Sequence, residues 1–333
     1  MSTLATTVAV QQPRKGGWLR KIGWAFLVLL LILAVLAGVF WWRPTAVVGQ
    51  IGRTILWVDG VRGHYVTVDG HRIHYLTGGS GRPVVLLHGL GGRAEDWAGL
   101  LPSLISGGFT AYAVDLLGYG ASDKPDVDYS IALEADVVRK FLDRESAQPV
   151  DLVGWSMGGW VALKFAAEHP ERVHTLTLID SAGFDFNAPD PRVLRPRTPQ
   201  ELEKMAALFS PKAAAIPGFV ARDILRVMGE QDWVFARALD SMYSRRDLMD
   251  GKVGDLTMPV LLLWGSKDVL TPLAAGSAMH GQMPTSILRV IDGCGHVALT
   301  ECSERVVPAI VAFLQAHYNS NQASSNMANS HRG

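Results

Sequence analysis

The chain has 333 residues, 48% of them hydrophobic, which is enough to bury the core of one large domain with an insertion. Its 31 basic residues balance 31 acidic ones, a composition that does not favour a nucleic-acid partner. Two cysteines are too few for a disulfide scaffold, neither has metal-ligand spacing with the ten histidines, and Gly118-x-Gly120 lacks the spacing of a dinucleotide loop. We therefore expect no nucleic acid, no metal and no cofactor.

An uncharged apolar run occupies residues 22–42. At about 1.5 Å per residue, a helix of this length crosses a hydrocarbon core of ~30 Å. A cleavable signal peptide would have a shorter apolar region and a small-x-small site after it, whereas the bulky Phe40-Trp41-Trp42 closes this run. The basic residues within 1–21 predict that this N-terminal segment is cytoplasmic. We expect one uncleaved transmembrane anchor, with the rest of the chain on the outer, extracytoplasmic side.

A connector at 43–62 has moderate apolar content, compatible with a short helix near the membrane surface, and a hairpin with a type I′ turn is expected around Asp69-Gly70. Residues 63–182 and 256–318 then alternate short apolar strands with helices. The expected buried strands are 83–87, 109–114, 150–153, 173–179, 260–264 and 287–291. This alternation predicts a mostly parallel sheet with helices on both faces. The last helix is expected to end near His317, and the polar tail 319–333 is expected to be disordered.

The alternation of strands and helices stops within residues 183–255. After a loop rich in Pro, Arg and Asp, this insertion has helical segments at 201–209, 220–228 and 233–243 but no strand. It predicts a helical cap over the carboxyl edge of the sheet, where open α/β sheets bind ligands. Two interpretations of its apolar residues stay open: they line a substrate pocket, or they pack the cap onto the core. The candidate pocket residues are Trp155, Phe209, Phe219 and Trp233.

The motif Gly154-Trp155-Ser156-Met157-Gly158-Gly159 lies between an apolar run and a helical segment. In such a strand, turn and helix, the serine is lifted clear of the sheet, and Gly154 and Gly158 allow close approach of backbone. The Met157 N–H would lie at a helix N-terminus, where it can stabilise an oxyanion. We therefore predict that Ser156 is a catalytic nucleophile.

A serine nucleophile needs a base, and the base needs an orienting group. Asp268 and His296 each follow a predicted strand, and the chain order Ser156, Asp268, His296 is the one that this arrangement requires. Alternatives stay open for both: Asp268 as a helix cap, and His296 as a buried histidine bonded to backbone. Asp180, which follows the preceding strand, competes with Asp268 for the role of triad acid.

The segment His88-Gly89-Leu90-Gly91-Gly92 ends an earlier predicted strand. It is placed to offer the Leu90 N–H as a second oxyanion donor, with His88 and Gly89 supporting the loop rather than acting as a base. Cys294 lies two residues before His296, but Ser156 already occupies the elbow. We therefore interpret Cys294 as a packing residue.

With these residues in hand, the chain from about 61 to 318 resembles the α/β-hydrolase superfamily. The motifs that carry the resemblance stand in the family's order: His88-Gly89, 115–125, 154–159, 264–268 and 295–301. It implies an α/β-hydrolase fold with a helical cap insertion. The nearest likeness is to capped serine hydrolases of the monoacylglycerol lipase and esterase type, including membrane-anchored members. Trp155 fills a variable position of the elbow, where it is expected to narrow the pocket.

The resemblance implies a serine hydrolase that cleaves carboxylic esters through an acyl-enzyme, and the anchor suggests a lipid-like ester such as a monoacylglycerol. Ser156 argues against dehalogenases and epoxide hydrolases, which place aspartate at this position. Two alternatives remain: hydrolysis of a carbon–carbon bond in a vinylogous diketone, and a catalytically silent scaffold on the same fold.

Overall fold

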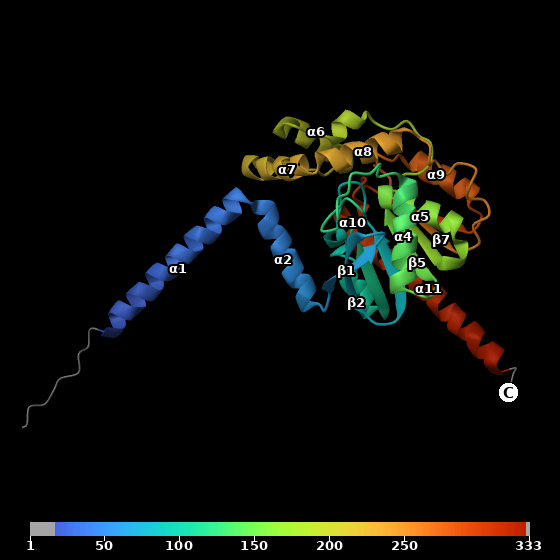
Figure 1. Ribbon diagram of the computed structural model, residues 1–333, viewed down its shortest axis with the longest axis horizontal. Helices are drawn as coiled ribbons and strands as arrows, with labels where there is room; N and C mark the ends of the chain where they lie inside the picture. Colours follow the sequence, from blue (N-terminus) through green and yellow to red (C-terminus); the bar gives the residue numbers. More distant parts are fainter. Residues whose placement is uncertain (1–16, 331–333) are drawn as a thin grey trace, which may run out of the picture.

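The computed structural model describes residues 17–330. Residues 1–16, which include Arg14 and Lys15 of the segment predicted to be cytoplasmic, and residues 331–333 lie outside the described part. An eight-stranded sheet forms the centre of the α/β portion of the chain, in the order β1-β2-β4-β3-β5-β6-β7-β8 (Figure 1). The strands are β1 Arg62–Val68, β2 His71–Gly79, β3 Arg82–Leu87, β4 Phe109–Val114, β5 Val150–Trp155, β6 Val173–Ile179, β7 Val260–Gly265 and β8 Ser286–Ile291.

The sheet is mostly parallel, as the sequence predicts. Only the pairs β1–β2 and β2–β4 are antiparallel. The β1–β2 turn has positive φ at Asp69 (49°) and Gly70 (83°), which is the conformation of a type I′ turn. All six strands expected from the apolar runs are present within a residue or two of the predicted bounds, although β8, at the edge of the sheet, is largely exposed.

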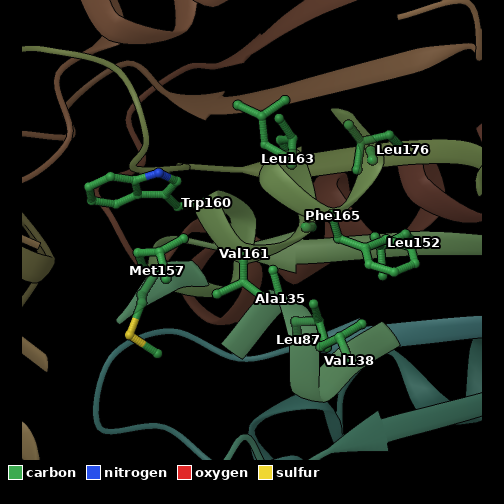
Figure 2. Close-up of a cluster of buried hydrophobic side chains, with 14 of the residues drawn as sticks. Leu87, Ala135, Val138, Leu152, Met157, Trp160, Val161, Leu163, Phe165 and Leu176 are labelled. Carbon is green, nitrogen blue, oxygen red and sulfur yellow. The ribbon is translucent and has the colours of Figure 1, made fainter. Parts of the chain in front are cut away.

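Helices cover both faces of the sheet, and the side chains of each strand alternate between two cores. On β3, Val85 and Leu87 belong to the core that includes α4 (Ile131–Glu145) and α5 (Met157–Glu168). Val84 and Leu86 belong to the opposite core, under α3 (Leu101–Ser106), α10 (Ala298–Glu301) and α11 (Ser303–Ser330). Figure 2 shows Val161 and Phe165 of α5 among Leu87, Leu152 and Leu176 of the strands. Burial on both faces explains why these strands are continuous apolar runs.

The insertion between β6 and β7 is helical. It contains η3 (Pro191–Leu194), α6 (Pro199–Phe209), α7 (Gly218–Glu230) and α8 (Asp232–Tyr243), close to the predicted helices. These helices lie together at one end of the sheet (Figure 1). At α6, Thr198 accepts a bond from the Glu201 N–H while Glu201 reaches back to the Thr198 N–H, a capping box that fixes where the helix begins.

Two helices precede the sheet: α1 (Gly17–Trp42) and α2 (Pro44–Val58). Within α1, Arg20–Trp42 has a mean hydropathy of 2.8 and is long enough to cross a membrane, and none of it is buried. A core helix of a soluble domain would be mostly buried, so this exposure separates α1 from that class. Helix α1 extends away from the α/β portion, and α2 returns to it (Figure 1).

Helix α11 is longer than the sequence indicated. It continues past His317, where we expected its end, and reaches Ser330 within the segment that we expected to be disordered. The residues from 319 to 330 contain no glycine or proline, so nothing in this part of the sequence breaks a helix that has already begun.

Candidate active site

Ser156 joins the end of β5 to the start of α5 in a strained conformation. Its φ and ψ are 55° and −118°, a region that residues other than glycine rarely adopt. Hydrogen bonds hold it there: its N–H donates to the Ile179 carbonyl (3.0 Å), and its carbonyl accepts from Trp160 (3.2 Å) and Ala182 (3.1 Å). The strained turn directs the hydroxyl away from the sheet and toward the cap.

The turn also requires two glycines. A Cβ on Gly154 would lie 2.4 Å from the Gly158 carbonyl oxygen, and a Cβ on Gly158 would lie 2.2 Å from the Leu87 carbonyl oxygen. Both clashes would be with backbone, which cannot move aside as a flexible side chain can. The expected roles of Gly154 and Gly158 in close packing therefore have a direct geometric basis.

We predict that Gly158→Ala destabilises the fold by several kcal/mol, because α5 would have to move off the sheet. The matched control is Gly281→Ala in α9 (Leu273–Gln282), where a Cβ meets nothing within 4 Å; it should be neutral or stabilising by about 0.5–1 kcal/mol. Denaturant unfolding of the two variants measures the difference. Equal stability of both would contradict the packing argument.

Ser156, His296 and Asp268 form a continuous series of hydrogen-bonded side chains. His296 Nε2 lies 2.9 Å from Ser156 Oγ, and His296 Nδ1 lies 2.9 Å from Asp268 Oδ2. The side chains of His296 and Asp268 are completely buried. A carboxylate only accepts hydrogen bonds, so Nδ1 carries the proton and Nε2 is free to accept the Ser156 O–H.

Asp268 lies in a turn that supplies its remaining partners. Its Oδ1 accepts from the N–H groups of Leu270 (2.8 Å) and Thr271 (2.9 Å). The Thr271 hydroxyl lies 2.7 Å from Asp268 Oδ2 and 3.1 Å from His296 Nδ1. The capping alternative for Asp268 therefore describes only part of its contacts, since the same carboxylate binds the turn and the histidine. Thr271 was not singled out from the sequence.

Asp180 lies close by but has different partners. Its Oδ1 accepts from the Gly265 N–H at 2.7 Å, and its carbonyl lies 2.9 Å from the Thr271 hydroxyl. Complete burial, together with the nearby Asp268 carboxylate, raises the pKa of Asp180 well above its usual value. The structure thus places Asp268 against His296, with Asp180 behind it as a buried carboxyl group.

The loop after β3 passes directly beside the serine. A Cβ on Gly89 would lie 3.3 Å from the Ser156 Cβ, so only a small residue lets Leu90 follow this closely. His88 is buried, and its Nε2 accepts from the Leu116 N–H (3.1 Å). Its Nδ1–H therefore donates to the Gly89 carbonyl (2.7 Å). With both ring nitrogens bonded to backbone, His88 connects the loop after β3 to the segment after β4.

Asp115 fixes the far side of the same loop and was missed at the sequence level. Its carboxylate accepts from the N–H groups of Ala94 (2.6 Å) and Ala121 (2.8 Å) and lies 2.8 Å from His74 Nδ1. Burial alone would raise its pKa, but the hydrogen bond to His74 and the two backbone donors outweigh that effect and lower it. Its place after β4 was visible in the sequence, but its partners were not.

A cavity of about 370 Å³ lies over Ser156 and His296. Trp155 and Phe209 line it, as expected: the Trp155 indole N–H donates to the His296 carbonyl (2.9 Å), and the Phe209 ring lies edge-on to the His296 ring at 5.5 Å. Its other apolar walls come from η3, α8 and the loops after β6 and β7, and include Phe184, Leu194, Phe235, Leu239, Met242 and Leu270.

The other two predicted pocket residues lie elsewhere. Phe219 stacks on Trp41 at the end of α1, with ring centroids 4.5 Å apart. Trp233 is 41% exposed and packs edge-on against Tyr129, with Arg237 over its ring. An apolar cap residue can face the core, the cavity or another helix, and helical periodicity does not separate these cases.

Cys294 is completely buried in the core on the α11 side of the sheet, which agrees with its interpretation as a packing residue. It also forms a disulfide with Cys302, which was not predicted from the sequence. Their Cα atoms are 6.4 Å apart, and the bridge encloses the loop that carries His296. Glu301 closes the loop further by accepting the Gly295 N–H. Among the described residues, Cys294, Glu301 and Cys302 lie close enough together to suggest a metal site, but both sulfur atoms are bonded to each other in the disulfide.

We predict that the double variant Cys294→Ala/Cys302→Ala loses about 2–3 kcal/mol of unfolding free energy, the amount expected for opening so short a loop. Activity should fall as well, because His296 loses a restraint. Adding a strong thiol reductant under mild denaturation should reproduce the loss in the wild type and leave the variant unchanged. A wild type that responds no more than the variant would contradict a structural role for the bridge.

The comparisons with known proteins agree with this geometry. Residues 84–309 match the alpha/beta hydrolase family. The chain belongs to this family. An uncharacterized protein of Mycobacterium tuberculosis is 31% identical to this alpha/beta hydrolase over 264 residues, which are 71% of this chain and 76% of the relative.

Two further relatives differ in chemistry. A 2-hydroxy-6-oxononadienedioate/2-hydroxy-6-oxononatrienedioate hydrolase of Cupriavidus pinatubonensis is 29% identical over 270 residues, 72% of this chain and 88% of the relative. The crystal structure of a membrane phospholipase A, described as a bacterial virulence factor, superposes with a TM-score of 0.77 at 28% identity. The superposed region covers 88% of this chain and 98% of the phospholipase chain. The family supports hydrolytic chemistry, and its members act on more than one type of bond.

Proposed function

We propose that this alpha/beta hydrolase is a serine hydrolase that cleaves carboxylic esters of membrane lipids, such as monoacylglycerols. The observation that carries the proposal is the series from Ser156 Oγ to His296 Nε2 and from His296 Nδ1 to Asp268, each at 2.9 Å, beneath an apolar cavity. In this assignment Ser156 is the nucleophile, His296 the general base and Asp268 the group that orients the histidine.

In the first half-reaction, Ser156 Oγ attacks the ester carbonyl while its proton passes to His296 Nε2. The backbone N–H groups of Leu90 and Met157 are proposed to hold the oxyanion of the tetrahedral intermediate, and Asp268 stabilises the imidazolium. His296 then gives the proton to the departing alcohol, and the acyl group stays on Ser156. In the second half-reaction water loses a proton to His296 and attacks the acyl-enzyme, which releases the fatty acid and restores Ser156.

The lining of the cavity and the length of α1 favour a lipid substrate. A cavity of about 370 Å³ walled by phenylalanine, leucine and methionine side chains suits an acyl chain better than a polar substrate. The exposed apolar α1 would hold this site at a bilayer, where such esters are concentrated. The similarity to a membrane phospholipase A points in the same direction.

We also propose that the hydrolase portion lies on the extracytoplasmic side, with residues 1–21 in the cytoplasm. The Cys294–Cys302 disulfide supports this side, since such bonds persist in oxidising compartments. Reporter fusions after Gly60 test the orientation. An alkaline phosphatase fusion should be active; activity from a reporter that works only in the cytoplasm would overturn the orientation.

A second candidate reaction is hydrolysis of a carbon–carbon bond in a vinylogous diketone, because curated relatives at 28–30% identity carry that activity. Their names specify dioate substrates, which carry two carboxylates. In the cavity over Ser156, Arg245 is ion-paired with Asp185 rather than free to bind a substrate carboxylate. This pairing favours the ester.

Turnover on a series of esters of increasing acyl length tests the proposal. We expect long-chain monoacylglycerols presented in vesicles to be cleaved faster than short, water-soluble esters. A parallel assay with a 2-hydroxy-6-oxo-dienedioate should show little turnover. If short esters greatly outperform long-chain ones, the lipid assignment fails; if the dienedioate is the best substrate, the second candidate replaces it.

A further inference from the structure

A second cavity, of about 360 Å³, lies where α2, the cap and the loop 88–92 after β3 meet. We call this loop the oxyanion loop, after the role proposed for Leu90, and the cavity the junction cavity. Thr45 of α2, Gly91 and Gly92 of the loop, and Ile224, Val227 and Met228 of α7 are among the residues that line it. Most of this lining is apolar, and it includes neither Ser156, His296 nor Asp268. Its charged members are Arg93, Asp96, Arg195, Arg197 and Asp232.

One side of the junction cavity is tied to the end of the apolar span. Trp41 stacks on Phe219 of α7 with the ring planes 8° apart, and the Phe40 ring lies 5.8 Å from Phe219. Thr45, three residues beyond the span, donates its N–H to Asp223 of α7 at 3.0 Å. If α1 crosses a bilayer, these contacts hold the first turns of α7 at the lipid–water boundary.

Asp223 makes this attachment specific. Its side chain is only 1% exposed, and it accepts bonds from the N–H and hydroxyl of Thr45 and from Arg226. Burial alone would raise its pKa, but the bonds from Thr45 and Arg226 outweigh this effect and lower it. A buried carboxylate with charged and backbone donors is costly to separate from them, so anchor and cap are expected to move together.

The other side of the junction cavity reaches the active site. Five residues line both cavities: Leu90, Trp155, Leu194, Phe209 and Phe235. Leu90 follows Gly89, which lies against Ser156, and Trp155 precedes Ser156 in the elbow. The two cavities are therefore adjacent, and the five residues that they share have apolar side chains that can change rotamer.

We infer that the junction cavity is the passage through which the hydrocarbon chain of an ester still embedded in the bilayer reaches Ser156. The inference rests on the proposed ester hydrolysis and adds the route by which the substrate reaches Ser156. The occupant is a hydrocarbon chain because most of the wall is apolar and because the cavity extends from Thr45, three residues beyond the apolar span, to the loop that carries Leu90. A lipid that enters here avoids exposing its chain to water, which favours bilayer-resident over soluble substrates.

Filling the passage should separate the two substrate classes. In the full-length protein reconstituted in vesicles, Val227→Trp and Met228→Trp should each lower turnover of a vesicle-embedded long-chain monoacylglycerol by about tenfold or more. Turnover of water-soluble p-nitrophenyl butyrate should stay within about twofold of the wild type, because a small ester can reach Ser156 through the cavity above it. The matched control is Leu225→Trp on the same helix; Leu225 does not line either cavity, so neither activity should fall.

The possible outcomes distinguish the passage from the underlying function. Selective loss on the embedded ester in the two cavity-filling variants supports the passage. Unchanged turnover of the embedded ester, or equal loss on both substrates, overturns it while leaving ester hydrolysis intact. A wild type that cleaves neither ester would instead overturn the proposed function.

Discussion

Replacing Ser156 with alanine is expected to lower kcat on a soluble ester by about 10⁴-fold or more, with an unchanged fold. The variant removes the proposed nucleophile, the Oγ that lies 2.9 Å from His296 Nε2. Steady-state kinetics and thermal unfolding on the same samples measure the two quantities. The backbone N–H groups of Leu90 and Met157, which we propose bind the oxyanion, remain in the variant and are expected to account for its residual rate.

Ser181→Ala is the matched control for this substitution. Ser181 is also buried beside α5, but its hydroxyl donates to the Ala182 carbonyl at 2.7 Å rather than to the histidine. Its loss should leave kcat within about tenfold of the wild type. Near-normal turnover by Ser156→Ala would remove Ser156 from the mechanism.

The second large effect is expected at Asp268. Asp268→Asn should lower kcat by about 10⁴-fold, because an amide cannot both accept the His296 Nδ1–H and keep its bonds to Leu270 and Thr271 without presenting an N–H to one of them. The histidine would then favour the tautomer with the proton on Nε2, which cannot accept the Ser156 proton.

Asp180→Asn provides the comparison that decides between the two acids. Burial and the nearby Asp268 raise the pKa of Asp180, and an amide of the same shape preserves the acceptor for the Gly265 N–H. We expect a loss of less than about tenfold. A large loss at Asp180 with a small one at Asp268 would transfer the role of triad acid to Asp180.

The sequence predicted the sheet and the turn at Ser156 because both depend on local signals. The central strands are short, predominantly apolar runs bounded by glycine, proline or polar residues, and such runs have few alternatives once helices lie between them. The glycines around Ser156 likewise mark a place where backbone approaches backbone. The positions of Asp268 and His296 follow from the rule that the carboxyl ends of parallel strands meet at one edge.

Contacts between distant segments could not be predicted in the same way. Phe219 packs on Trp41 and Asp223 binds Thr45, 178 positions apart in each case, and no local pattern encodes which apolar cap residue meets the anchor. The disulfide was missed for a different reason. Cys302 lies eight positions after Cys294, and only the fold shows that the intervening loop returns close enough to join them.

The most direct test of the account is to locate the activated serine chemically. Membranes containing the full-length protein are treated with a fluorophosphonate, which phosphonylates activated serine hydroxyls, and the protein is digested and mapped by mass spectrometry. We predict a single modified peptide that contains Ser156, with labelling lost after His296→Ala. A well-folded protein that takes up no reagent, or whose adduct maps to another serine, would contradict the assignment of Ser156 as the nucleophile.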